Sequence, residues 1–416
     1  MFDKMMSDIK SNERLPMIRS NNWRIQESRF PKENYHHKES VFTIGNGYYA
    51  SRGSFEEGYP QEIGTTFVHG VFNDVPVFAT ELVNFPCWFS LKIMVEGETF
   101  CLNTGKILDY HRELDMGSGL LLRRVSWESP GGRRFTAIFE RFADMENIHH
   151  GALRFTLTDF NFSGRIQVRA DIPGVVSNEQ YRHWQHLDQG RQAENSCFLA
   201  LETRGTHIRA DISEACTIKK GDQSLESTYW DAHWMPTLVY GTEVQPGDTI
   251  TGVKHSMIYT SREVPEPEVQ AKKSLGQILE KDFDQLLDRC QKVWEELWAN
   301  SNITIKGDDE ADRALRYNLF QILIAAPRHD DTVSIGAKTL SGYGYRGHVF
   351  WDTEIFILPF FIYTQPGIAR NLLMYRYHTL PGAKEKAKIN GYLGALYACE
   401  SASPGEDVTP SCVVGP

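Results

Sequence analysis

The sequence predicts a multidomain β + α protein, with an N-terminal antiparallel β-sandwich followed by a run of helices. Two features of the residue pattern carry this prediction. Apolar and polar residues alternate in short segments before about residue 260, and the apolar period then lengthens to three or four residues. The chain has 416 residues. Because one hydrophobic core rarely serves a chain of that length, two or more domains are expected.

The strands are predicted by a two-residue period. It recurs in four clear segments: 91–95, 134–142, 152–158 and 165–172. Each segment has one apolar and one polar side, as a strand with one buried face does. Turn residues separate them, Glu96-Gly97 after the first segment and Pro130-Gly131-Gly132 before the second. Many short strands with few helical patterns predict a large antiparallel sandwich.

The pattern becomes helical after Val264-Pro265-Glu266-Pro267, whose two prolines end the strand signal. A second helix is predicted to follow Asp308-Asp309, a third to run from about Thr353 through Ile362, and a fourth to open after Pro366. The first of the series is predicted as one long amphipathic helix, from apolar residues at helical spacing: Leu275, Leu279, Phe283, Leu286, Cys290, Val293 and Leu297.

Composition narrows the class of protein. A net charge of -10 argues against nucleic acid as a partner, because such a partner requires a basic face. The sequence has no apolar run near the ~20 residues of a membrane span and no signal-peptide core at its start. Seven scattered cysteines favour reduced thiols and a cytoplasmic location. The pairs His36-His37 and His149-His150 are interpreted as surface residues, and no metal is expected.

The segment from Gly342 to Phe356 has the composition of a sugar-binding site. A pyranose ring has apolar C–H faces and a rim of hydroxyl groups, so it is held by an aromatic plane beside carboxylate acceptors and Arg or His donors. Trp351 and Asp352 supply the plane and the carboxylate, and Arg346 and His348 are candidate donors. The alternative interpretation is an aromatic helix start at which Asp352 caps backbone N–H groups.

Six segments match one known family in order along the chain: Phe42 to Tyr48, Arg52 to Glu57, Ser341 to His348, Phe350 to Glu354, Thr379 to Ala383 and Glu406 to Pro410. In these segments the chain resembles the family 65 glycoside phosphorylases, which act on maltose, trehalose, kojibiose or nigerose, and their trehalase relatives. The resemblance implies an N-terminal β-sandwich over residues 1–264, a helical linker over 265–304 and the start of an (α/α)6 barrel over 305–416.

The resemblance also implies a reaction. In the family, inorganic phosphate cleaves an α-glucosyl disaccharide with inversion, which yields β-glucose 1-phosphate and free sugar. Phosphate is then a co-substrate, no cofactor is expected, and complete relatives are expected to be homodimers. Two alternatives remain open, a family-related α,α-trehalose hydrolase and a non-catalytic carbohydrate-binding or assembly fragment. The disaccharide linkage is not specified by the sequence.

The barrel is expected to be incomplete. Twelve helices with loops need more than about 200 residues, whereas about 110 follow Ile305. The family's general acid and phosphate loop would align beyond Pro416, so no catalytic acid is assigned. An incomplete barrel is expected to leave apolar side chains uncovered, namely Leu319, Ile322, Leu323, Ile357 and Leu358.

Two glutamates close to the Trp-Asp motif are not assigned as the acid. Glu354 lies two residues from Asp352 and is expected to be buried or paired with Arg346. Glu400 is also set aside. Relatives tend to carry Trp where Cys399 and Cys412 stand, and these departures remove stacking area from the neighbourhood of the sugar.

Overall fold

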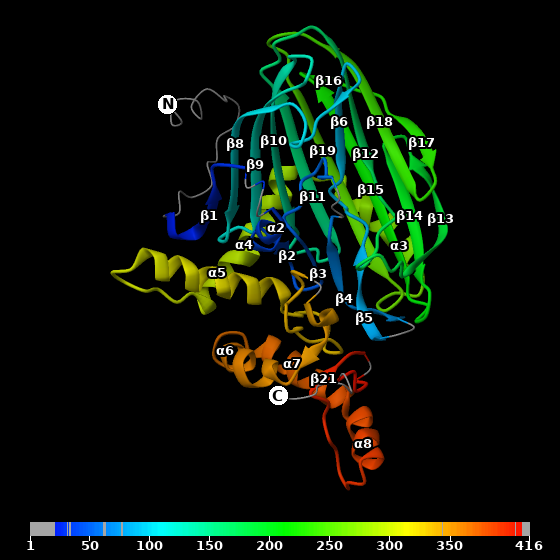
Figure 1. Ribbon diagram of the computed structural model, residues 1–416, viewed down its shortest axis with the longest axis vertical. Coiled ribbons are helices and arrows are strands. Elements are labelled where there is room, and N and C mark those ends of the chain that lie inside the picture. The colour runs from blue at the N-terminus through cyan, green and yellow to red at the C-terminus, as the bar shows by residue number, and fades with distance from the viewer. Residues whose placement is uncertain are drawn as a thin grey trace.

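The computed structural model of the protein describes residues 21–30, 32, 35–60, 64–75, 78–342, 344–403 and 405–409. An antiparallel β-rich domain comes first, helices follow it in sequence, and the helices after residue 308 lie at one end of it (Figure 1). The predicted order of strands followed by helices is therefore confirmed. Pro416, Cys412 and Tyr343 lie outside the described residues.

Three antiparallel sheets build the first domain. The largest contains, in spatial order, β1 (Arg24–Glu27), β8 (Lys106–Asp115), β9 (Leu120–Glu128), β10 (Arg134–Ala143), β11 (His150–Thr158), β19 (Ile250–Thr260), β15 (Arg209–Lys220), β14 (Ser196–Thr203) and β13 (Trp184–Ala193), with β16 (Gln223–Ser224) beside β15. The second contains β17 (Thr228–Ala232), β18 (Met235–Val244), β12 (Gly164–Asp171), β6 (Leu91–Val95) and β7 (Glu98–Thr99). The third contains β2 (Ile44–Gly45), β3 (Tyr49–Ser51), β4 (Thr66–Val75) and β5 (Phe78–Phe85).

The sheets share one apolar core. All four segments with the two-residue period are strands, namely β6, β10, β11 and β12. On β6 the positions Leu91, Ile93 and Val95 are buried while the residues between them are half-buried. The Glu96-Gly97 turn joins β6 to β7 with both residues at positive φ, the geometry of a tight hairpin. The predicted strand faces and turn are confirmed.

The predicted long helix is wrong, because the structure forms two helices in its place. These are α3 (Pro267–Ile278) and α4 (Phe283–Ser301). Asp282 is the N-cap of α4: its carboxylate accepts from the Gln285 backbone N–H, and the Gln285 side chain accepts from the Asp282 N–H. This capping box starts a new helix at a point where the apolar period continues unbroken. Leu279, counted in the apolar stripe, is exposed.

Helix α5 (Asp309–Ala325) begins where predicted, with the Asp308 carboxylate accepting from the Ala311 backbone N–H. Residues of the sandwich bind the carboxyl end of α5. The backbone N–H of Gly47 donates to the Ile324 carbonyl at 2.8 Å, and His69 Nε2 lies 2.8 Å from the Ala325 carbonyl. Burial lowers the pKa of His69 to about 4, so the neutral ring donates from Nε2. The last carbonyls of a helix lack intrahelical donors, and here Gly47 and His69 of the sandwich supply the donors.

Glycine is required at position 47. Its φ of 85° lies in the left-handed region, and an added Cβ would collide with the Ala326 carbonyl. The Gly45-Asn46-Gly47 motif is therefore a turn that contacts α5. Asn46 holds this turn by donating to the carbonyls of Asp144 and Ile148 at 2.8 and 2.9 Å.

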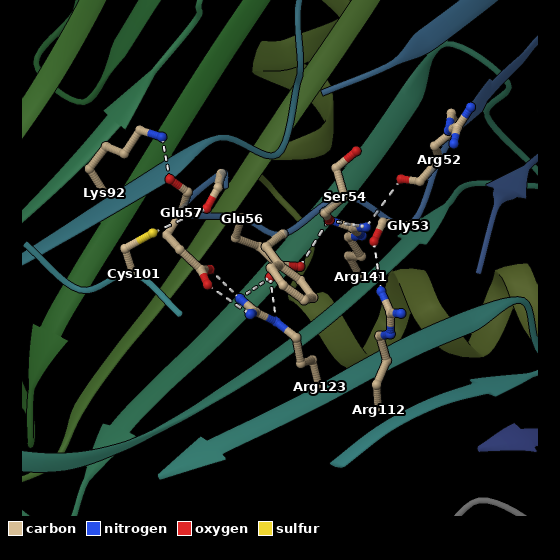
Figure 2. Close-up of polar contacts among 12 residues, drawn as sticks. Arg52, Gly53, Ser54, Glu56, Glu57, Lys92, Cys101, Arg112, Arg123 and Arg141 are labelled. Atoms are coloured by element: carbon tan, nitrogen blue, oxygen red, sulfur yellow. Dashed lines mark hydrogen bonds and ion pairs between the residues drawn. The ribbon is translucent and has the colours of Figure 1, made fainter. Parts of the chain in front are cut away.

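The Arg52 to Glu57 segment is held inside the sandwich by arginines from three adjacent strands (Figure 2). Arg123 on β9 donates to Glu56 at 3.0 Å and to Glu57 at 2.8 Å. Arg141 on β10 donates to Glu56 at 2.9 Å. Arg112 on β8 donates to the Gly53 carbonyl at 2.8 Å and to Glu27 at 3.0 Å.

All six charged residues of this buried network, Glu27, Glu56, Glu57, Arg112, Arg123 and Arg141, are less than a tenth exposed. Burial on its own would raise the pKa of the Glu56 carboxyl, but the Arg123 and Arg141 guanidiniums outweigh burial and hold that pKa below its ordinary value. Aromatic rings complete the environment, with the Arg141 guanidinium 3.7 Å from the Phe89 ring centre. The family-like motif at 52–57 is thus a structural element of the sandwich.

The helices after α5 form the far end of the molecule (Figure 1). They are a 3-10 turn η2 (Gly344–Gly347), a π-turn η3 (Thr353–Ile357), α6 (Leu358–Thr364), α7 (Pro366–His378) and α8 (Leu380–Ile389), with a two-stranded sheet of β20 (Val349–Phe350) and β21 (Glu400–Ser401) between them. The third and fourth predicted helices are confirmed. Two short elements complete the chain order: η1 (Asn21–Trp23) precedes β1, and α2 (Tyr35–Val41) lies between β1 and β2.

The residues expected to be uncovered are in fact covered. Leu319, Leu323 and Leu358 are buried, and Ile322 and Ile357 are partly buried against the core. The reason is that α5 and α6 turn these side chains toward the sandwich and α7. The interpretation of the histidine pairs is correct for His36 and His37 and wrong for His150, which is fully buried with Nδ1 2.9 Å from Asp144.

Two further facts concern the described residues. The six cysteines among them, at positions 87, 101, 197, 216, 290 and 399, are free thiols. No helix in the described part of the chain is both long and apolar enough to cross a membrane.

Replacing Arg123 with Met is expected to destabilise the sandwich by about 3–5 kcal/mol, because Glu57 would lose its buried arginine partner and Glu56 would lose Arg123 while keeping Arg141. The control is Arg124→Met on the same strand. Arg124 pairs with Asp109 at 3.5 Å, and both side chains are partly exposed, so its loss should cost less than about 1 kcal/mol. Urea unfolding of both variants measures the difference. Equal free energies of unfolding would contradict the structural role of the network.

Candidate functional site

The predicted sugar-binding segment begins with a strained turn. Tyr345 and Arg346 have φ values of 55° and 53°, and Gly347 follows at 74°. Left-handed backbone at a bulky residue costs roughly 1–3 kcal/mol and persists only where the surroundings hold it. Three consecutive left-handed residues therefore require firm external contacts.

Strand β5 of the sandwich supplies these contacts through three successive residues. The carbonyl of Thr80 lies 2.5 Å from His348 Nε2. The carboxylate of Glu81 accepts from Arg346 Nη1 at 3.1 Å. The side chain of Leu82 packs against Gly347 so closely that a Cβ there would clash. We call these three contacts the β5 clamp.

The Glu81 carboxylate is itself held by residues of the sandwich. His183 Nε2 lies 2.7 Å from Glu81 Oε1, and His183 Nδ1 lies 3.0 Å from the Asn73 side-chain amide nitrogen. The Asn73 carbonyl oxygen accepts from the backbone N–H groups of Gly205 and Thr206 at 2.7 and 3.3 Å. This fixes the amide orientation, so Asn73 donates to Nδ1 and the ring donates from Nε2 to Glu81. A relay of hydrogen bonds thus runs from the sandwich interior to Arg346.

Trp351 and Asp352 follow β20, and both are exposed. The Trp351 side chain is 50% exposed. Asp352 has helical backbone angles, and its carboxylate makes no capping bond, so the alternative interpretation as an N-cap is not supported. The π-turn η3 begins at the next residue, Thr353, which is buried and donates to the Ile335 carbonyl at 2.9 Å. Such turns occur frequently at functional sites.

Arg346 and His348, the two predicted donors, face the sandwich. His348 is 1% exposed, and its ring nitrogens are occupied by Thr80 and by Glu400, the latter at 2.6 Å from Nδ1. Arg346 keeps part of its side chain accessible while bound to Glu81. Arg346 and His348 therefore anchor the segment to the sandwich, and Trp351 and Asp352 remain exposed.

The two glutamates near the motif are both in ion pairs. Glu354 accepts from Arg376 Nη2 at 2.7 Å, so the expected pairing with Arg346 is wrong. The reason is that α7 brings Arg376 next to η3, where it also donates to the Phe350 carbonyl at 3.1 Å. Glu400 on β21 is buried against His348. Cys399, next to it, is exposed.

A cavity of ≈ 20 Å³ lies behind the segment, lined by sandwich residues such as His69 and Phe72 and by Ser334 and Val349. One water molecule needs about 10–15 Å³ by this measure, so a pyranose does not fit there. Trp351 does not line this cavity and is exposed instead.

This fold, a β-rich domain that clamps a Trp-Asp segment at the start of a helical region, matches a carbohydrate-active enzyme family in both of its parts. Residues 25–297 match the N-terminal domain of glycosyl hydrolase family 65, and residues 316–415 match its central catalytic domain. The chain belongs to glycosyl hydrolase family 65.

Its relatives include disaccharide phosphorylases. The chain is 35% identical to the kojibiose phosphorylase of Halothermothrix orenii over 94% of its own length and 51% of the relative. It is 32% identical to the α,α-trehalose phosphorylase of Thermoanaerobacter brockii, covering 92% of this chain and 53% of the relative. A solved structure from the human microbiome that carries the name kojibiose phosphorylase superposes with a TM-score of 0.86 at 25% identity, covering 94% of this chain and 53% of that chain. The chain thus spans about half the length of these relatives.

Sequence reasoning missed Glu81, His183 and Asn73. Asn73 lies on β4, Glu81 on β5, and His183 immediately before β13. All three are far from the motif in sequence, and none has a distinctive local pattern. The pair of bulky residues before Gly347 was a possible signal for an unusual turn, but positive φ at Tyr and Arg is not predictable from residue type.

Replacing Glu81 with Gln is expected to loosen the strained turn, because the charged hydrogen bond to Arg346 is worth about 1.5–3 kcal/mol. Hydrogen exchange of the backbone amides of residues 345–350 should accelerate at least tenfold, as ~1.4 kcal/mol implies. Glu202→Gln is the matched control, since Glu202 also lies beside a histidine, at 3.1 Å from His207, but away from the turn. Unchanged exchange in the Glu81 variant would show that the clamp does not hold the turn.

Proposed function

We propose that this chain forms part of an inverting disaccharide phosphorylase, in which phosphate cleaves an α-glucosyl disaccharide to β-glucose 1-phosphate and free sugar. One observation carries the proposal: in a family 65 chain whose named relatives include phosphorylases, Trp351 and Asp352 are exposed side by side after β20. Trp351 would pack on the glucose ring, and Asp352 would accept from its hydroxyl groups. Arg346 and His348, proposed as sugar donors from the sequence, support this surface from behind.

The reaction class determines which groups are needed. An inverting hydrolase needs an acid and a second carboxylate that activates water. A phosphorylase needs only the acid, because phosphate brings its own nucleophilic oxygen and is held by N–H, hydroxyl or cationic donors. The two glutamates considered from the sequence, Glu354 and Glu400, bind Arg376 and His348. Because both glutamates are paired, neither is favoured as a second catalytic carboxylate. This supports an assignment of the acid and the phosphate site to the part of the family fold that lies beyond this chain's match.

The chain would begin the family's (α/α)6 barrel with α5 to α8 and would use phosphate as co-substrate without a cofactor or metal. The six free thiols support a reducing compartment, and we place the protein in the cytoplasm.

Sugar binding is tested by titration calorimetry with glucose. Trp351→Ala is expected to weaken binding up to about tenfold, since stacking contributes roughly 0.5–1.5 kcal/mol, and Asp352→Asn should weaken it as well. Trp230→Ala is the control, because Trp230 is 41% exposed on the sandwich strand β17, outside the proposed sugar-binding segment. Equal losses in the Trp351 and Trp230 variants would refute the assignment.

Phosphorolysis by the chain alone is expected to be negligible. Absence of the general acid costs on the order of 10²–10⁴ in rate, and absence of the phosphate site adds to this. Maltose, trehalose, kojibiose and nigerose are each incubated with phosphate, and glucose 1-phosphate is assayed. Robust turnover would mean that the acid lies within these 416 residues.

A further inference from the structure

One arginine of α7 contacts the chain on both sides of Trp351 and Asp352. Arg376 Nη2 donates to the carbonyl of Phe350, the residue before Trp351, at 3.1 Å. The same nitrogen donates to Glu354 Oε2, two residues after Asp352, at 2.7 Å. A terminal guanidinium nitrogen carries two N–H groups, so both contacts form at once. Arg376 therefore joins the two ends of a short stretch whose middle is the exposed pair.

The carboxylate of Glu354 depends on this arginine. Glu354 Oε1 is buried and has no hydrogen-bond partner among the described residues, whereas Oε2 binds Arg376. The Arg376 side chain is 13% exposed. Burial of a charged group is unfavourable unless the group is paired, and charge-assisted hydrogen bonds are roughly twice as strong as neutral ones. Arg370, earlier on the same helix, is exposed instead. Of these two arginines, one faces water and the other binds residues 350 and 354.

A second set of contacts holds the guanidinium in place. Ser401 Oγ donates to the Val349 carbonyl at 3.1 Å. Because a hydroxyl has one proton and two lone pairs, this oxygen then accepts from Tyr375 OH at 3.0 Å and from Arg376 Nη1 at 3.4 Å. Tyr375 and Ser401 are buried. Two consecutive residues of α7 thus act on the two residues of β20, one through Ser401 and one directly.

Little regular structure holds the stretch itself. Strand β20 is two residues long, and the π-turn η3 begins at Thr353. Between them, the Glu354 N–H donates to the Trp351 carbonyl at 3.1 Å. The Trp351 side chain is 50% exposed, so packing covers only part of it. The relative placement of Trp351 and Asp352 therefore depends on what binds residues 350 and 354.

We propose that Arg376 is a positioning residue of the candidate sugar site. By holding the Phe350 carbonyl and the Glu354 carboxylate at once, it fixes the Trp351 ring and the Asp352 carboxylate in the relative orientation that one pyranose contacts. A site that is already ordered binds more tightly, because less freedom is lost on binding. Arg376 acts through these groups and does not touch the sugar. The orientation of Trp351 is argued from contacts alone, whereas the effect on sugar binding rests on the proposed function.

Fluorine NMR of the full 416-residue chain labelled with fluorotryptophan tests the orientation. The Trp351 signal is assigned by its loss in Trp351→Phe. Arg376→Met is expected to shift or broaden this signal, because the stretch loses both of its end contacts. Glu354→Gln removes the charge with little change of shape and is expected to shift the signal in the same direction by a smaller amount. Arg370→Met is the matched control on the same helix and should leave the signal unchanged.

The buried sandwich tryptophans Trp88, Trp127 and Trp184 report folding in the same spectra. If their signals move in Arg376→Met, that variant is misfolded and Glu354→Gln decides. Glucose titration adds a second readout. Arg376→Met is expected to weaken glucose binding by about three- to tenfold, a loss of the size that stacking on one aromatic ring contributes. Arg370→Met should leave the affinity unchanged.

An unchanged Trp351 signal in both Arg376→Met and Glu354→Gln overturns the proposal, and so does an equal shift in Arg370→Met. The two readouts also separate positioning from function. A glucose affinity that falls in Trp351→Ala and stays unchanged in Arg376→Met overturns the positioning role and leaves the proposed function standing. A shifted Trp351 signal in a chain that binds no glucose supports the orientation by Arg376 and counts against the proposed function.

Discussion

The hydrogen bonds that close the carboxyl end of α5 fix the position of every later element. Gly47 and His69 donate to the Ile324 and Ala325 carbonyls, and both donors come from the sandwich. Just beyond the helix, Arg328 donates to the Asn46 and Met145 carbonyls at 3.0 and 3.1 Å. A buried carbonyl left without a donor costs about 1–3 kcal/mol, so the end of α5 has little freedom to move relative to the strands. The chain after residue 326 therefore starts from a fixed position relative to the sandwich.

A second constraint acts at the other end of the connecting segment, where β5 holds residues 346–348. Trp351 and Asp352 therefore follow two attachments to the sandwich in sequence, the second of which holds the left-handed turn. The β-rich domain contributes to the candidate site through its contacts with residues 346–348. It acts as the frame against which a short segment can be kept in an unfavourable backbone conformation.

The sequence predicted the features that depend on local pattern. Strand faces, the Glu96-Gly97 hairpin, the start of α5 and Pro366 at the start of α7 all follow from residue type and period, and they are confirmed. The break between α3 and α4 was missed because an apolar stripe can continue across a capping box. The partners of Arg346, Glu354 and His150 were missed for a different reason. Side-chain partners are chosen by tertiary contact: β5 reaches Arg346 from a distant part of the chain, α7 brings Arg376 to Glu354, and the turn before β11 brings Asp144 to His150.

The six-residue ionic network in the sandwich also restricts how this sequence can change. Its three glutamates and three arginines sum to zero charge, and each is buried. Loss of any one partner leaves an uncompensated charge at a cost of about 3–5 kcal/mol, a large part of the 5–15 kcal/mol that typically keeps a domain folded. Exchange of the whole set for apolar residues of similar volume can be neutral. The charged set and an apolar set can therefore be equally stable, but the single substitutions that lead from one set to the other give a poorly folded protein. Epistasis thus blocks mutational drift at these six positions, irrespective of what the helical region binds.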